Sequence, residues 1–169
     1  MGDLTRRHFE RQAEACERMK SPFTANLLRL GAAQLVPGTT FATRVLDWPD
    51  DRMRDDALAL RFAGALHACV LSDRAPDLAA CYPPNAAPDD ETLWQAVSRT
   101  MAADDEFLSD FLNHPPQTNE TGRAAVLLLG FQRAARDTGN PLSMLELGAS
   151  AGLNQNWDRF AYAFAGTTW

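Results

Sequence analysis

The segment 142–154 constrains the fold more than any other part of this 169-residue sequence. A short apolar run is followed at once by Gly148 and Gly152. An apolar run of this length that ends in glycines is typical of a buried strand that enters a tight turn. Residues 153–164 then have apolar side chains at helical spacing. We therefore predict a strand at 142–147, a glycine-rich turn and the start of a helix.

Helical periodicity dominates the chain ahead of this segment. Residues 4–137 show no convincing alternation of apolar and polar side chains, so they are predicted to be helices and loops. The helix at roughly 56–72 is apolar over most of its circumference and should be central. Local signals for helix ends, which are side-chain caps, prolines in the first turn and a terminal glycine, stand at Ser21, Pro22, Pro76, Asp89, Asp90 and Gly139. The sequence thus predicts a mainly α fold, with a helical domain at 1–137 and the first βα unit of an incomplete α/β domain at 138–169.

The composition limits the cellular compartments and the kinds of binding partner that we expect for this chain. The formal net charge is −6, and an acidic surface disfavours a bulk electrostatic grip on nucleic acid. Cys16, Cys69 and Cys81 have no partner at metal-site or redox spacing, so we expect no metal site and three free thiols in a reducing compartment. No apolar run approaches the ~18 residues that cross a bilayer. We expect a cytoplasmic protein that does not enter membranes.

The glycine-rich turn fits the opening motif of a class I methyltransferase best. In this interpretation Gly148 and Gly152 let the backbone approach S-adenosylmethionine, and Glu146 orients its amino-acid portion. A helix that starts near Asn154 would offer free N–H groups to the ligand's carboxylate. Ser150 stands where a glycine is common, and we expect it to avoid a positive φ. The predicted cofactor-binding residues are therefore Glu146, Gly148, Ser150, Gly152 and Asn154.

Other interpretations of the same turn remain open. Gly148-Ala149-Ser150-Ala151-Gly152 also matches the nucleophile elbow of α/β-hydrolases, with Ser150 as nucleophile. That interpretation needs a later histidine, and the last histidine here is His114. A nicotinamide-type fold would want a small residue where Leu153 stands, and a phosphate-binding P-loop would want a lysine after the glycines. The turn could also be tight for packing alone.

A second set of polar residues starts the helix that leads into the predicted strand. Asn119, Glu120 and Arg123 are expected to line a pocket beside the glycine-rich turn. The alternative is purely structural, because an Asn or Thr side chain can cap a helix and Glu120 is favourable in a first turn.

Several stretches resemble one family of uncharacterised bacterial proteins, a domain of unknown function with a helical N-terminal half and a methyltransferase-like C-terminal half. They are FERQA at 9–13, SPF at 21–23, RFAGALH at 61–67, YPP at 82–84, PQTNETGR at 116–123, ELGASAGLN at 146–154 and WDR at 157–159. The resemblance spans nearly the whole chain. It implies members of roughly twice this length, so that this chain looks like the N-terminal half. It implies a fold and a cofactor, and no substrate.

Motif and resemblance together predict an S-adenosylmethionine-dependent methyltransferase-like protein, with this chain incompetent by itself. The first alternative is a non-catalytic helical interaction or regulatory module whose site is vestigial, and the second is the serine hydrolase. An unpaired strand at 142–147 would also expose backbone N–H and C=O groups. We therefore expect self-association through this segment.

Overall fold

The computed structural model describes residues 3–116, 120–164 and 166–168. The chain divides into two compact units, Met1–Pro116 and Gln117–Trp169. This division falls ahead of the domain boundary that the sequence analysis set between residues 137 and 138. The helix at Arg123–Thr138 accounts for the difference, because it packs on the segment that follows the glycine-rich turn.

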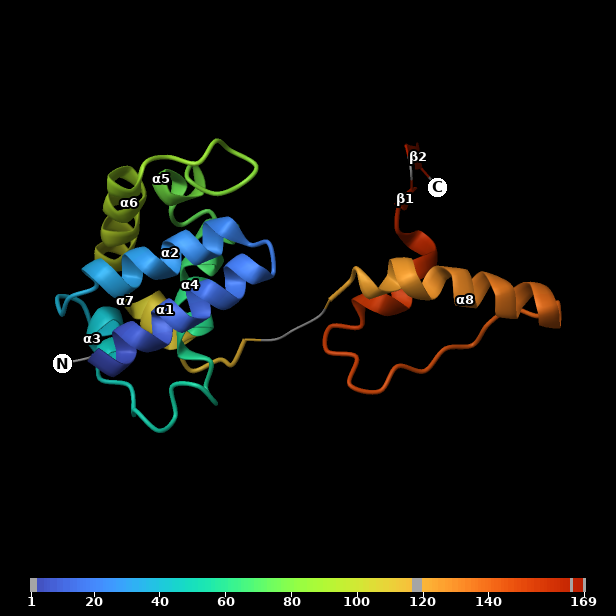
Figure 1. Ribbon diagram of the computed structural model, residues 1–169, viewed down its shortest axis with the longest axis horizontal. Helices are drawn as coiled ribbons and strands as arrows, with labels where there is room; N and C mark the ends of the chain where they lie inside the picture. The colour runs from blue at the N-terminus through green and yellow to red at the C-terminus, as the bar shows by residue number, and fades with distance from the viewer. Residues whose placement is uncertain (1–2, 117–119, 165, 169) are drawn as a thin grey trace. The chain divides into compact units, whose positions relative to one another are not determined.

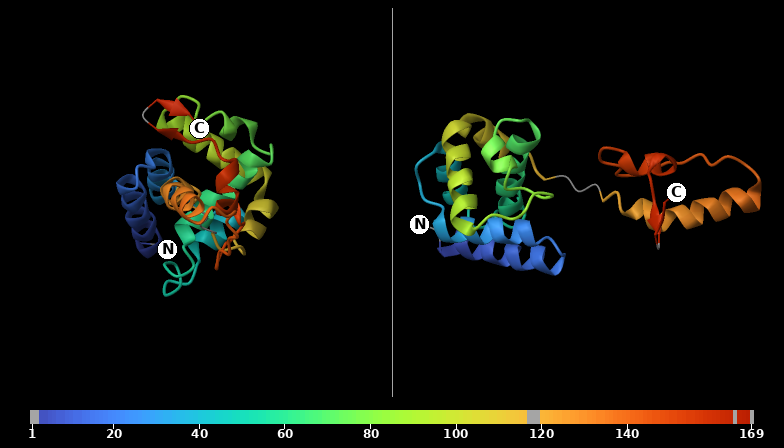
Figure 2. Two further views of the ribbon diagram at one scale, coloured as in Figure 1. Left: turned by 90° about the vertical axis from the view of Figure 1, so that its right-hand side faces the viewer. Right: turned by 90° about the horizontal axis from the view of Figure 1, so that it is seen from above.

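Helices and their connections make up the described part of the first unit (Figure 1). They are α1 (Asp3–Arg18), α2 (Pro22–Gln34), α3 (Thr40–Leu46), α4 (Leu58–Leu71), α5 (Pro76–Ala79), α6 (Asp90–Ala103) and α7 (Asp105–Phe111). Figure 1 shows α1 and α2 side by side, and the right-hand view of Figure 2 shows them along one side of this unit. The prediction of a mainly helical fold is confirmed.

The starts of α2, α5 and α6 follow local signals in the sequence, although the Ser21 side chain does not form the expected cap on α2. Pro22 and Pro76 are the first residues of α2 and α5, where the missing N–H of proline costs nothing. The Asp89 carboxylate accepts a hydrogen bond of 2.7 Å from the backbone amide of Thr92 at the start of α6. This hydrogen bond satisfies one of the amides that a helix start leaves without a partner.

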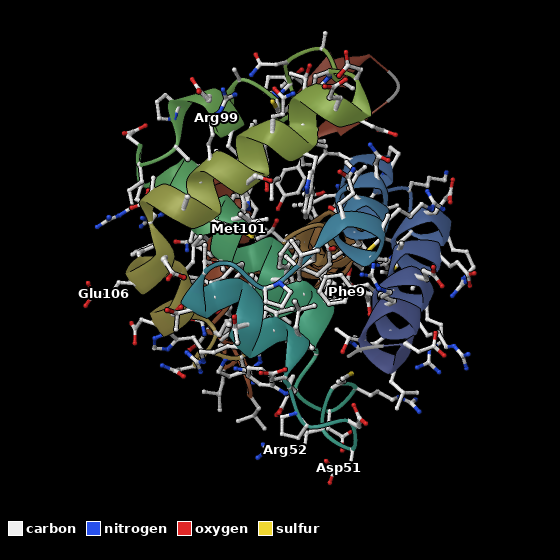
Figure 3. The ribbon with its side chains drawn as sticks, turned by 90° about the vertical axis from the view of Figure 1, so that its left-hand side faces the viewer. Phe9, Asp51, Arg52, Arg99, Met101 and Glu106 are labelled. Atoms are coloured by element: carbon white, nitrogen blue, oxygen red, sulfur yellow. The ribbon has the colours of Figure 1, made fainter. Side chains whose placement is uncertain are left out.

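The core of the first unit surrounds α4, which contacts α1, α2, α5, α6 and α7. Phe62 on α4 is fully buried; its ring stacks on Phe41 with 5.6 Å between centroids and meets Phe9 edge-on at 5.3 Å. Figure 3 shows Phe9 pointing from α1 into this core. The predicted central position of the 56–72 helix is confirmed, because aromatic rings from three helices meet on it.

The second unit is built on α8 (Arg123–Thr138). α8 ends at Gly139, whose φ of +66° makes it the predicted terminal glycine. The chain then runs back in the direction opposite to α8, as the right-hand view of Figure 2 shows. It continues into the 3-10 helix η1 (Leu153–Arg159) and a short antiparallel pair, β1 (Ala163–Phe164) with β2 (Thr167–Thr168).

Two predicted elements of the second unit are wrong. Within the described part of the chain, residues 142–147 form no strand and no backbone ladder. Leu145 and Leu147 are 85% and 87% exposed. The helix predicted at 153–164 is instead a 3-10 helix that ends at Arg159. A strand needs a neighbour to accept and donate its hydrogen bonds, and no described segment supplies one, so the predicted βα unit is not formed.

The three cysteines all lie in the first unit. Cys16, Cys69 and Cys81 are free and buried. Across the residues that the structure describes, no helix has both the length and the apolar character needed to cross a membrane.

Candidate functional site

The glycine-rich turn has three residues in the left-handed region of backbone space. The φ angles are +67° at Gly148, +53° at Ser150 and +69° at Gly152. Glycine adopts this conformation without strain, whereas a serine there is uncommon. The expectation that Ser150 avoids a positive φ is therefore wrong. Alternating left-handed positions make a tight, irregular turn, and they explain why glycines stand at both ends of it.

Both glycines of the turn face open space on the side where a side chain would stand. A Cβ atom added at Gly148 or Gly152 would meet no described atom within 4 Å. Packing against the rest of the protein therefore does not explain either glycine. The backbone conformation explains them, and the open side of the turn leaves room for a bound group.

Glu146 and Asn154 lie on the two sides of this turn and face each other. The Asn154 side-chain amide donates a long hydrogen bond of 3.4 Å to Glu146 Oε1. Asn154 is only 7% exposed. Among the described residues, the buried Glu146 Oε2 atom has no hydrogen-bond partner. A buried carboxylate oxygen without a donor is costly, so this atom is positioned to accept a hydrogen bond from a further group.

Aromatic contacts hold η1 against the rest of the second unit. The Trp157 indole N–H points at Met144 Sδ at 2.8 Å, and its ring lies 4.9 Å from that of Phe131 on α8. The Tyr162 hydroxyl donates to the Trp157 carbonyl oxygen at 2.5 Å. Trp157 therefore serves the small core that positions the two ends of the turn.

The structure does not place Glu120 and Arg123, the described members of the second predicted set, in the lining of a pocket beside the turn. Asn119 lies outside the described residues. Glu120 is exposed, and its Oε1 accepts a hydrogen bond of 2.7 Å from the backbone amide of Gly122, next to the exposed Arg123. A cavity of about 370 Å³ separates the start of α8 from η1 and from Tyr162. The described residues that line it include Thr121, Gly122 and Leu153, and neither Glu120 nor Arg123.

A different cavity, in the first unit, was missed by the sequence analysis. It has a volume of about 530 Å³ and is lined by side chains that include Arg44, Trp48, Arg52, Asp56 and Arg61. The only sequence signal was Arg61, which begins the RFAGALH stretch of the family resemblance. The other residues come from a helix and a loop with no motif of their own, so their proximity could not be predicted from local spacing.

Comparison with known proteins identifies a family and no characterised relative. A family model described as "Uncharacterized protein conserved in bacteria (DUF2332)" matches residues 6–169. Neither the curated proteins nor the solved structures include a match to this chain. The match confirms the bacterial family that the sequence resembles, and the methyltransferase-like character of its C-terminal half remains a prediction.

Proposed function

The chain belongs to this bacterial family of uncharacterised proteins, and on that premise we propose that its second unit carries part of an S-adenosylmethionine site of a methyltransferase-like protein. The proposal rests mainly on the buried Glu146 Oε2 atom. This atom has no hydrogen-bond donor among the described residues and lies at the edge of an open turn with left-handed backbone. The amino-acid portion of S-adenosylmethionine carries an ammonium group that would satisfy it.

Each residue of the turn has a role in this proposal. Glu146 accepts a hydrogen bond from the amino-acid portion, directly or through a water, and Asn154 holds the carboxylate in place through Oε1. Gly148 and Gly152 keep the approach free, because any side chain there would extend into the open space. Ser150 bends the chain between the two glycines. S-adenosylmethionine itself supplies the methyl group; these residues bind and orient it.

Segment 142–147, which precedes the turn, supports the same proposal. Exposure alternates along it: Leu142, Met144 and Glu146 are partly covered, whereas Leu145 and Leu147 are exposed. A period of two is the side-chain pattern of a strand. The segment thus has the exposure pattern of a strand without the neighbours of one. In the proposal it becomes a strand when a further strand pairs with it, which also orders the turn that follows.

Calorimetric titration with S-adenosylmethionine tests the proposal. The resemblance implies that part of the cofactor site lies outside these residues, so the full-length protein and the 169-residue chain are titrated side by side. We expect measurable binding to the full-length protein, and loss of that binding in Gly148→Val. Gly139→Val is the matched control, because Gly139 has the same φ and equally open surroundings but lies at the end of α8. Glu146→Gln should weaken binding roughly tenfold, as expected for one charge-assisted hydrogen bond.

Three outcomes would overturn the proposal. Absence of binding to the full-length protein would leave the interpretation of a helical interaction module with a vestigial site. Equal loss in Gly148→Val and Gly139→Val would mean that both substitutions act through folding. Undiminished binding in Glu146→Gln would contradict the role of the Glu146 carboxylate in binding, on which the proposal rests.

The hydrolase alternative is favoured by one observation. A nucleophile elbow holds its serine in a strained turn, and Ser150 has a φ of +53°. Against it, His8, His67 and His114 all belong to the first unit. A fluorophosphonate probe that labels the protein, but not its Ser150→Ala variant, would replace the methyltransferase proposal with the hydrolase one.

A further inference from the structure

The cavity of about 530 Å³ in the first unit is a second candidate site, and it is independent of the function proposed above. Its charged and aromatic lining comes from the end of α3, the loop between α3 and α4, and α4 itself. The residues concerned are Arg44, Asp47, Trp48, Arg52, Asp56 and Arg61. The volume lies within the range of small-molecule sites.

Arg61 is the buried member of this lining. It is 9% exposed, and its Nε donates to the Asp56 carbonyl oxygen at 2.6 Å while Nη1 donates to the Leu112 carbonyl oxygen at 2.8 Å. Its Nη2 makes no hydrogen bond with the described residues; the nearest carboxylate oxygen, Asp56 Oδ1, is 3.9 Å away. A guanidinium that is nine-tenths buried therefore keeps donor capacity on a cavity wall.

Both carboxylate oxygens of Asp56 already accept hydrogen bonds from neighbouring side chains. Its Oδ2 accepts from the Trp48 indole N–H at 2.9 Å, and its Oδ1 accepts from Arg52 Nη2 at 3.1 Å. The Trp48 hydrogen bond is the main reason that the pKa of Asp56 lies below its ordinary value, with the charge of Arg52 adding to it. Asp56 is thus a carboxylate at neutral pH and holds Trp48 and Arg52 in place on the wall.

Arg44 is anchored by the end of α7 and the turn after it, which also holds Arg61 through the Leu112 carbonyl oxygen. Its Nη1 donates to the Ser109 carbonyl oxygen and its Nη2 donates to Asn113 Oδ1 at 2.9 Å. These contacts to α7 and to the turn after it immobilise the guanidinium before any ligand arrives. Two arginines, Arg44 and Arg61, are therefore fixed by backbone carbonyl oxygens, which reduces the entropy that a ligand would have to remove.

The charge of the lining differs from that of the chain. Three arginines face two aspartates, Asp47 and Asp56, which leaves one positive charge, whereas the whole chain carries −6. A planar guanidinium matches a carboxylate in two parallel hydrogen bonds. The indole of Trp48, which has Arg61 5.7 Å from its ring centroid, adds an apolar surface.

We propose that this cavity binds a small organic monocarboxylate, with its carboxylate on Arg52 and Arg61 and its apolar body against Trp48. A single charge matches the single excess positive charge. A phosphate dianion would bring a second negative charge close to Asp47, which lines the same cavity. Arg44 completes the polar wall on the side of Asn113.

The test is an NMR titration of the full 169-residue chain at constant ionic strength. The reporter is the Trp48 indole N–H signal, assigned from its absence in Trp48→Phe. Benzoate is the probe, benzamide is its neutral counterpart, and inorganic phosphate is the third arm. We expect a saturable shift with benzoate, and none with benzamide. Arg52→Gln should weaken benzoate binding roughly tenfold, as expected for the loss of one charge-assisted contact.

Arg99→Gln is the matched control, because Arg99 is exposed, pairs with Asp77 and does not line the cavity. Figure 3 shows Arg52 and Arg99 at opposite ends of the first unit. Arg61 is left unchanged, since it holds two backbone carbonyl oxygens and its removal would disturb the fold. Equal weakening in Arg99→Gln, an equal response to benzamide, tighter binding of phosphate, or no saturable shift with benzoate would each overturn the proposal.

Discussion

The carboxylate of Asp105, the first residue of α7, accepts a hydrogen bond of 2.7 Å from the backbone amide of Phe41 in α3. Its other oxygen accepts from the amide of Thr40 at 2.8 Å. These amides start α3 and have no partner within that helix. A residue more than sixty positions away thus completes the cap that Thr39 begins by accepting from the amide of Ala42.

Asp105→Ala should lower the free energy of unfolding by about 1–2 kcal/mol, because it leaves two helix-start amides without their acceptor. Urea denaturation followed by circular dichroism measures this. Glu106→Ala is the control: Glu106 is exposed on the same helix, so its change should stay within about 0.5 kcal/mol. Equal effects of the two substitutions would contradict the trans-capping role.

Stability should fall as the pH drops below 6.5, and His8 should account for part of this fall. Burial first, and the charge of Arg11 second, lower the pKa of His8 from its ordinary value of 6.5. Between 6.5 and the lowered value, the unfolded chain binds a proton that the folded protein resists, so the free energy of unfolding decreases with acidification. Below the lowered pKa both states are protonated and the loss stops growing.

Denaturation profiles recorded from about pH 7.5 to pH 5 measure the dependence. His8→Gln keeps an acceptor for the Ala59 amide and should flatten the profile. His114→Gln is the control, because the His114 side chain is 66% exposed, and it should leave the profile unchanged. A profile that keeps its slope in His8→Gln would contradict the prediction.

Phe62→Ala should lower the free energy of unfolding by about 3–5 kcal/mol, since it removes the ring that joins Phe9 to Phe41 and leaves a cavity. The measurement is the urea midpoint of the variant at unchanged slope. Leu71→Ala, on the same helix but 74% exposed, should change the midpoint little. Similar midpoints for both variants would show that the aromatic cluster is not central to the first unit.

The chain should self-associate weakly through segment 142–147. Leu145 and Leu147 are exposed beside backbone groups without a described ladder partner, which makes this segment receptive to a second strand. Leu145→Lys with Leu147→Lys should shift the weight-average mass toward the monomer in light scattering. Leu71→Lys, at another exposed leucine, should not. A strict monomer at all concentrations would contradict this prediction.

Sequence reasoning succeeded where the signal was local. Pro22, Asp89 and Gly139 mark helix ends because the missing N–H of proline, the side-chain acceptor and the left-handed backbone act within one turn. It failed at 142–147, because strand formation depends on a partner that sequence pattern does not supply. The apolar run and the glycines were real features, yet the pattern alone could not say whether the backbone would be paired.

The candidate sites were likewise predicted only where the sequence signal was local. Gly148 and Gly152 were predicted to lie in a glycine-rich turn, and the structure gives both a positive φ. The positive φ of Ser150 was not predicted, since serine carries no such preference. The arginine cavity could not be predicted at all. Arg44, Arg52 and Arg61 come together only through the packing of α3 against α7 and the course of the loop before α4.

The three buried thiols offer a way to follow the first unit alone. Cys16, Cys69 and Cys81 all belong to it, on α1, on α4 and after α5, and burial raises the pKa of Cys69 to about 11. Alkylation of each thiol therefore requires a local or global opening, and its rate reports how often that part of the core opens. Because the second unit contains no cysteine, events at the glycine-rich turn are invisible to this chemistry. Alkylation rates and cofactor binding would thus give separate records of the two units in one sample.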